Sequence, residues 1–152
     1  MSRGKKTIIV LFLVFIAMQF IQPARNKSSE QQENIMKNFN FPASVTSILK
    51  TSCYDCHSSN TCYPWYSNIQ PLGWLLANHI KEGKNELNFS DFNKYSVRRQ
   101  ISKFKSIRNS IKDGTMPLAS YTWLHNNAKL SEASKALLID WSLRAADSLS
   151  NE

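Results

Sequence analysis

Two cysteines and a histidine lie close together in the run Cys53-Tyr54-Asp55-Cys56-His57. This C-x-x-C-H spacing is typical of covalent c-type haem attachment. Two residues between the cysteines set the sulfurs one helical turn apart, where each can form a thioether with a vinyl group of the same haem. His57 then lies beneath the iron as its proximal ligand. The run therefore predicts one covalent haem c, attached through Cys53 and Cys56 and ligated by His57.

The same run has two other possible uses. C-x-x-C also occurs as a thiol-disulfide motif in thioredoxin-like proteins, where it belongs to a βαβ unit, and this sequence has no strand-rich halves. The two cysteines and the histidine could instead bind zinc, with Cys62 or His79 as the fourth ligand. Structural zinc sites usually have a second pair of ligands, which is missing here. Haem attachment is therefore the favoured interpretation.

A second candidate iron ligand lies well downstream, in the Met116-Pro117 pair. A proline stiffens the loop that carries the methionine. The thioether of methionine is a soft ligand that raises the potential of the iron couple relative to bis-histidine ligation. We therefore expect Met116 to be the sixth ligand. His79 and His125 are the alternatives, and a gap-filling core side chain is the non-functional interpretation of Met116.

Composition indicates the elements that must hold these residues. A chain of 152 residues with 42% hydrophobic content predicts one folded domain, and four Trp, five Tyr and eight Phe could line a porphyrin. Four Gly and few runs that alternate at period two favour helices over a sheet. The net charge of +8 suggests an acidic partner or an anionic membrane surface. No recognition motif for nucleic acid accompanies that charge.

The apolar periodicity predicts about four helices around the haem. They are expected to run from Pro42 to the cysteines, from Pro71 to Gly83 as a C-cap, from Ser90 or Asp91 to Gly114, and from Ser131 onward. The last helix should pack across the first. The third carries many Lys and Arg side chains, which are usually a solvated surface and are otherwise a docking surface for an acidic redox partner.

The N-terminus carries a different signal. Arg3, Lys5 and Lys6 precede an apolar run of fourteen residues from Ile8 to Ile21, the pattern of a signal anchor or signal peptide. Because no small-x-small cleavage site follows, we favour an uncleaved inner-membrane anchor with its basic end inside. The predicted organisation is a signal anchor or signal peptide at 1–22, a polar linker at 23–41 and a haem-binding domain at 42–149, facing the periplasm or exported if the segment is cleaved.

The motifs taken together resemble the bacterial haem-binding domain family of small C-x-x-C-H proteins with one N-terminal membrane segment. The resemblance runs from about Pro42 to Trp141 and rests on the following motifs: Cys53 to His57, Tyr63-Pro-Trp-Tyr66, Pro71-Leu-Gly-Trp-Leu75, His79-Ile80, Leu87-Asn-Phe-Ser90, Met116-Pro117 and Leu124-His125. It implies a single-haem, cytochrome c-like all-α fold with the attachment and ligand residues named above. Cys62 does not belong to this pattern. In an oxidising compartment an unpaired cysteine suggests either a buried, inert thiol or an intermolecular disulfide, and we favour the buried thiol.

The sequence thus predicts an electron carrier rather than a catalyst: a membrane-tethered monohaem cytochrome c that passes single electrons to a redox partner on the periplasmic side. Trp65, Trp74, Tyr121 and Trp123 are the aromatic side chains expected to shield the haem. If the sixth position is open or weakly held, the alternative is a haem enzyme, such as a peroxidase, or a haem-based sensor.

Overall fold

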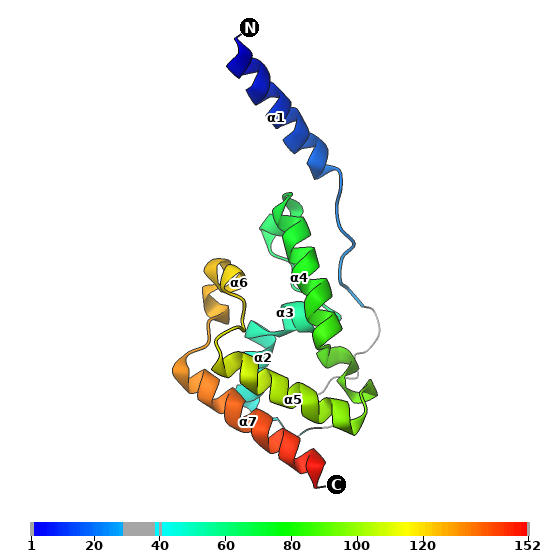
Figure 1. Cartoon of the computed structure of the whole chain (residues 1–152), viewed down its shortest axis with the longest axis vertical. Helices are drawn as coiled ribbons and strands as arrows, with labels where there is room; N and C mark the ends of the chain where they lie inside the picture. Colours follow the sequence, from blue (N-terminus) through cyan, green and yellow to red (C-terminus); the bar gives the residue numbers. More distant parts are fainter. Residues whose placement is uncertain (1, 29–38, 40, 152) are drawn as a thin grey trace.

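The computed structural model describes residues 2–28, 39 and 41–151, and within these ranges the chain consists of helices joined by loops (Figure 1). An isolated bridge between Lys27 and Asn60 is the one extended pairing among the described residues. The elements are α1 Arg3–Gln19, α2 Ala43–Ser52, α3 Tyr54–His57, η2 Trp65–Asn68, α4 Leu72–Glu86, η3 Phe89–Lys94, α5 Val97–Lys112, α6 Ala119–Leu124, η4 Asn126–Ala128 and α7 Glu132–Ser150. The all-α prediction is confirmed, with more and shorter helices than the four expected.

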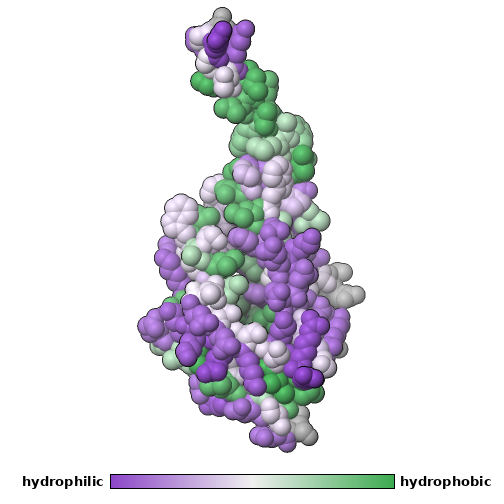
Figure 2. Space-filling model, viewed as in Figure 1, coloured by the Kyte–Doolittle hydropathy of each residue, from purple (hydrophilic) through white to green (hydrophobic). Residues whose placement is uncertain are grey.

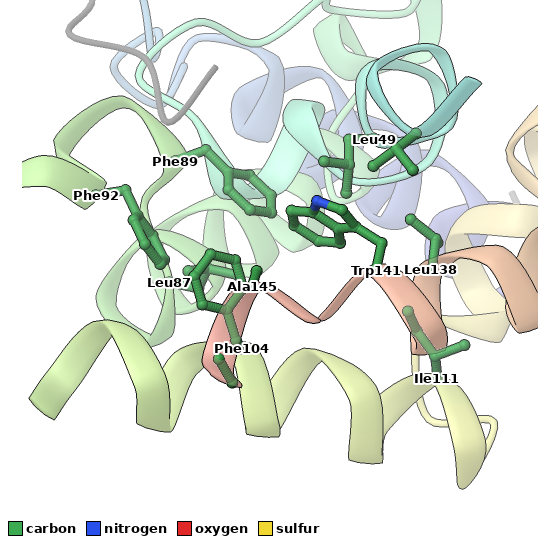
Figure 3. Close-up of a cluster of buried hydrophobic side chains, with 11 residues drawn as sticks. Leu49, Leu87, Phe89, Phe92, Phe104, Ile111, Leu138, Trp141 and Ala145 are labelled. Atoms are coloured by element: carbon green, nitrogen blue, oxygen red, sulfur yellow. The ribbon is translucent and has the colours of Figure 1, made fainter. Parts of the chain in front are cut away.

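The main hydrophobic core lies between α5 and α7, which run side by side at the end of the molecule opposite α1 (Figure 1). Phe104 of α5 is fully buried, with its ring centroid 5.3 Å from that of Trp141 on α7 and 5.0 Å from that of Phe92 (Figure 3). The last helix therefore packs mainly on α5 and less extensively on α2, the expected first helix of the domain. Leu49 of α2 and Phe89 complete the floor on which the candidate site lies.

A smaller apolar cluster joins η2 to α4. Its buried members are Tyr66, Leu76 and Ile80, with Cys56 and Tyr63 packed against them. This second cluster fixes α4 beside α3, so the C-x-x-C-H run is held between two separate sets of apolar contacts.

Two of the predicted helix boundaries are confirmed. Ser131 caps α7, because its side-chain oxygen accepts a hydrogen bond from the backbone N–H of Ser134 at 3.1 Å. Gly114 follows α5 with a φ of 67°, a left-handed conformation that glycine adopts without steric cost.

Two other boundaries were predicted wrongly. Gly83 does not end its helix, since α4 continues to Glu86. Neither Ser90 nor Asp91 caps α5, which begins at Val97. Asn88 accepts a hydrogen bond from the backbone of Ser90 and so starts the separate 3₁₀ turn η3 instead.

The apolar N-terminal segment forms α1, whose side chains are largely exposed and give the projecting end of the molecule a hydrophobic surface (Figure 2). In the part of the chain that the structure describes, no helix combines the length and apolar character needed to cross a membrane.

The predicted linker 23–41 lies partly outside the described residues, and its described beginning is bound to the domain. The Asn26 backbone N–H donates to the Tyr63 hydroxyl at 2.7 Å, and its side-chain amide donates to the Ser58 carbonyl at 2.8 Å. These bonds attach the segment that follows α1 to the loop that follows His57.

Candidate functional site

The C-x-x-C-H run forms its own short turn of helix. α2 ends at Ser52, and Cys53, with a φ of −128°, separates it from α3. The backbone N–H groups of Cys56 and His57 both donate to the Cys53 carbonyl, at 3.2 and 3.0 Å. Cys56 and His57 therefore lie on one tight turn that begins at Cys53, rather than at the end of the preceding helix, as the sequence had suggested.

The imidazole of His57 is held by two backbone carbonyls. Its Nδ1 lies 2.9 Å from the Gly83 carbonyl oxygen and 3.0 Å from that of Leu87. Because carbonyl oxygens only accept hydrogen bonds, Nδ1 carries the proton, and in the neutral ring Nε2 keeps its lone pair. Burial lowers the pKa of His57 despite these two hydrogen bonds, which favours the neutral ring. His57 is thus prepared to bind a metal through Nε2.

Gly83 makes this arrangement possible, because it lets the α4 backbone approach α3 closely. A Cβ atom at Gly83 would lie 2.8 Å from the Cys56 carbonyl oxygen and 3.2 Å from the Cys56 Cβ. A glycine in the middle of a helix therefore has a packing reason here and not a capping one.

Two adjoining pockets meet at the C-x-x-C-H run. They share six wall residues: Ser52, Cys53, His57, Glu86, Met116 and Pro117. Their volumes are about 210 and 240 Å³, so only the two together reach the ~300–1,000 Å³ of typical small-molecule sites. The structure brings Cys53, His57 and Met116 onto the walls of one composite cavity.

The first pocket rests on the main core. Leu49, Leu87, Phe89, Ile107 and Ile111 contribute to its walls. Four of these five also belong to the buried core cluster, so the wall is rigid rather than a flexible flap. A flat, apolar ligand would lie against side chains that the fold already holds in place.

The second pocket adds Cys56, His79 and Tyr121 to the shared wall. His79, an alternative sixth ligand, thus lies at the cavity. His125, the other alternative, lines neither pocket: its ring stacks on that of Tyr121 with centroids 4.1 Å apart, and its Nδ1 is 3.0 Å from the Tyr121 carbonyl oxygen.

Most of the aromatic side chains that were expected to shield the haem lie away from the cavity. Trp65 and Trp123 are 77% and 79% exposed, and Trp74 donates its indole N–H to the Ile21 carbonyl at 2.8 Å. Of the four aromatic side chains named from the sequence, only Tyr121 lines the cavity. Phe89, which the sequence reasoning missed, lines it too, and its place within the Leu87-Asn-Phe-Ser90 motif was the available signal.

An ion pair stands at the cavity. The Lys103 ammonium on α5 lies 3.7 Å from a carboxylate oxygen of Glu86 at the end of α4, and both residues line the first pocket. The Lys103 side chain is mostly buried. Among the described residues that line these two pockets, Lys103 is the only lysine or arginine. The sequence reasoning had assigned Lys103 to a solvated helix face.

Asp55, between the two cysteines, ties the surrounding loops to the motif. One carboxylate oxygen accepts the Tyr121 hydroxyl at 2.6 Å, and the other accepts the Cys62 backbone N–H at 3.0 Å. Burial and the bond to Asp55 raise the pKa of Tyr121. The expectation of a buried Cys62 is wrong: because its backbone is fixed on Asp55 at the surface, its thiol is exposed.

The two alternative uses of the cysteines gain no support from this geometry. Burial raises the pKa of Cys53 to about 12 and that of Cys56 to about 11, whereas reactive redox cysteines have lowered values. Among the described residues, no group of three or more His, Cys, Asp or Glu side chains is placed to hold a metal ion as zinc would require.

Comparison with known families now decides the broad identity. The model of the haem-binding domain family matches residues 13–144. The chain belongs to this haem-binding domain family. It is therefore a haem-binding protein with an all-α fold, as the sequence predicted. No curated protein and no solved structure gives a match.

The residues of this haem-binding domain fit the cofactor that the family name gives. A composite cavity with an apolar wall suits a porphyrin, and an imidazole with a free Nε2 suits the iron. The cysteines that would form thioethers lie on the same turn as that imidazole. This fit rests on the chain's own geometry and holds independently of the family match.

Proposed function

We propose that this protein is a monohaem c-type cytochrome, with haem attached through Cys53 and Cys56, His57 as the proximal ligand and Met116 as the sixth ligand. The observation that carries the proposal is the double hydrogen bond from His57 Nδ1 to the Gly83 and Leu87 carbonyls. It orients the ring and leaves Nε2 as a ligand at the wall that also holds Cys53 and Met116.

Bound haem supplies a one-electron iron couple, and the protein tunes and shields it. His57 acts as an imidazole whose basicity is raised by its two carbonyl partners. Met116 offers a soft thioether that favours the reduced state. Leu49, Ile107 and Phe89 exclude water from one side of the cavity. Lys103 is placed to neutralise carboxylates such as the haem propionates, and the His79 side chain in the second pocket is placed to hydrogen-bond to them.

The role proposed for the protein is electron transfer on the periplasmic side of the inner membrane, with α1 as its anchor. Support comes from the basic residues Arg3, Lys5 and Lys6, which begin an exposed apolar helix and would stay inside. Covalent haem attachment requires export in the same direction, so the two proposals agree.

The proposed partner is an acidic redox protein that docks on the basic surface of α5. Arg98, Arg99, Lys105 and Lys112 are exposed on this helix, beside the cavity that Lys103 lines. Electron-transfer rates should then fall as salt is raised, because screening weakens attraction between opposite charges. Rates indifferent to ionic strength would exclude this docking surface.

The decisive test is a pyridine haemochrome spectrum and an intact mass of the full chain, expressed with a cytochrome c maturation system. We expect a c-type spectrum and a mass increase of one haem that survives denaturation. The single variants Cys53→Ala and Cys56→Ala should each shift the spectrum toward one remaining thioether. A colourless chain with the mass of its amino acids alone would refute covalent attachment.

The assignment of Met116 as the sixth iron ligand needs a test of its own. The Met116 side chain is 36% exposed on its loop, so burial alone does not fix its place at the iron. Met116→Ala should abolish the sulfur-to-iron absorption band of the oxidised protein, while His79→Ala and His125→Ala should retain it. A spectrum unchanged in Met116→Ala would refute the assignment. Rapid carbon monoxide binding by the reduced parent protein would favour the second candidate function, a haem enzyme or sensor with an open sixth position.

A further inference from the structure

The end of α1 is bound directly to the haem-binding domain. The Gln19 side chain makes two bonds with the Gln70 backbone: its amide nitrogen donates to the carbonyl at 3.3 Å, and its oxygen accepts from the N–H at 2.9 Å. The Trp74 indole N–H donates to the Ile21 carbonyl at 2.8 Å. α1 is thus fixed to η2 and the start of α4, without a flexible spacer.

This end of the domain carries exposed apolar side chains. They are Phe20, Ile21, Trp65, Ile69, Leu72 and Leu75, which we call the proximal face. Its most exposed domain residue is Trp65, on the same short η2 turn whose Ser67 and Asn68 side chains accept hydrogen bonds from the Arg25 guanidinium. The proximal face is continuous along the chain with α1, which is itself apolar and exposed (Figure 2).

The length of α1 explains why such a face would be needed. Seventeen residues rise about 26 Å at 1.5 Å per residue, against ~30 Å for the hydrocarbon core of a bilayer. A helix shorter than the hydrocarbon core is accommodated by local thinning of the bilayer, which brings the residues that flank the helix closer to the headgroups. Because Gln19 is bonded to Gln70, the flanking residues of α1 include the proximal face itself.

We propose that the proximal face lies in the headgroup zone of the phospholipid bilayer that holds α1, so that the domain rests on the membrane in one orientation. This rests on the proposed membrane anchoring. Trp65 has the amphipathic ring that is enriched at membrane interfaces, and the neighbouring Arg25 can reach lipid phosphates while its planar group packs 4.2 Å over the Tyr63 ring. Leu72 and Leu75 supply apolar depth that α1 lacks.

The test uses nitroxide labels on the full-length, haem-loaded chain in vesicles of phosphatidylethanolamine and phosphatidylglycerol. Leu72→Cys and Leu75→Cys are each labelled in a Cys62→Ser background. Val97→Cys is the matched control, because it is 51% exposed, as Leu75 is 50% exposed, and begins α5 at the end of the molecule away from α1 (Figure 1). The Cys62→Ser parent measures any labelling of Cys53 and Cys56.

For each label we measure the ratio of its collisions with lipid-soluble oxygen to its collisions with a water-soluble nickel chelate. This ratio should be several-fold higher at positions 72 and 75 than at position 97. Equal ratios at the three positions would overturn the orientation. Labels shielded from both reagents would also overturn it, because a protein would then cover the face. A chain that never sediments with vesicles refutes the anchoring proposal first. The haemochrome spectrum of the same sample reports attachment independently.

Discussion

Replacing Gly83 by alanine tests the contact that holds His57. A methyl group at this position would lie 2.8 Å from the Cys56 carbonyl oxygen, so α4 has to move away from α3. The hydrogen bond from His57 Nδ1 to the Gly83 carbonyl, 2.9 Å long, should lengthen as a result. The substitution therefore acts on the proposed iron ligand through its hydrogen bond, at a position that itself lines the second pocket.

Two opposing effects set the expected change in the free energy of unfolding. Alanine is better than glycine within a helix by about 1 kcal/mol. Forcing extra atoms into a packed contact costs roughly 1–3 kcal/mol, and a weakened hydrogen bond roughly 0.5–1.5 kcal/mol more. The net expectation is a destabilisation of about 0.5–3.5 kcal/mol. Steric crowding thus outweighs helix propensity.

Urea denaturation of the parent and of Gly83→Ala measures this change. Ala77→Gly in the same helix is the control, since it should show the propensity loss of about 1 kcal/mol with no crowding. In the haem-loaded protein the midpoint potential should also rise, because a weaker hydrogen bond makes His57 a less basic ligand. If Gly83→Ala is instead more stable than the parent by about 1 kcal/mol, the close approach of the two helices is not required and the reasoning fails.

Three further substitutions test other contacts. Phe104→Ala should lower the free energy of unfolding by about 3–5 kcal/mol by emptying the core beneath the cavity, whereas the exposed Val97→Ala should change it by less than about 0.5 kcal/mol; urea denaturation checks both, and equal effects would contradict the assigned core. Tyr121→Phe removes the hydroxyl bonded to Asp55 and should lower the free energy of unfolding by about 1.5–3 kcal/mol in the same urea assay; an unchanged free energy of unfolding would contradict a stabilising role for this bond. Cys62 should react with a maleimide in the folded protein, as mass spectrometry would detect, and Cys62→Ser should remove that adduct at a cost below about 0.5 kcal/mol; an unreactive Cys62 would contradict its exposure.

The sequence was informative where chemistry depends on adjacent residues. The C-x-x-C-H run needs only one turn of backbone, so its local geometry follows from spacing alone. Met116 was found from its neighbour Pro117 and its distance along the chain, and it does lie at the cavity with Cys53 and His57. The helical periodicity of the later segments likewise predicted α5 and α7, because a buried stripe on a long helix is a strong pattern.

Contacts between distant segments were beyond this reasoning. A glycine near the end of an apolar pattern is typical of a helix cap, and nothing local shows that Gly83 must instead admit Cys56. Trp65 and Trp123 are aromatic, but their type alone does not say which side of a loop they face. Lys103 is one of many basic residues on α5, and only the three-dimensional structure shows that it lines the cavity and pairs with Glu86 at the end of α4.

Helix α4 links the two ends of the proposed mechanism. Its first turn carries Leu72 and Leu75 of the proximal face, and its last turns carry the Gly83 carbonyl that orients His57. Gly83 lies eleven positions after Leu72, which corresponds to about 16 Å along the helix axis. If the proximal face lies on lipid, the iron ligand is therefore held close to the bilayer by one rigid element. A redox partner that docks on the basic surface of α5 would then approach the cavity from the end of the domain that faces away from α1 and the bilayer (Figure 1).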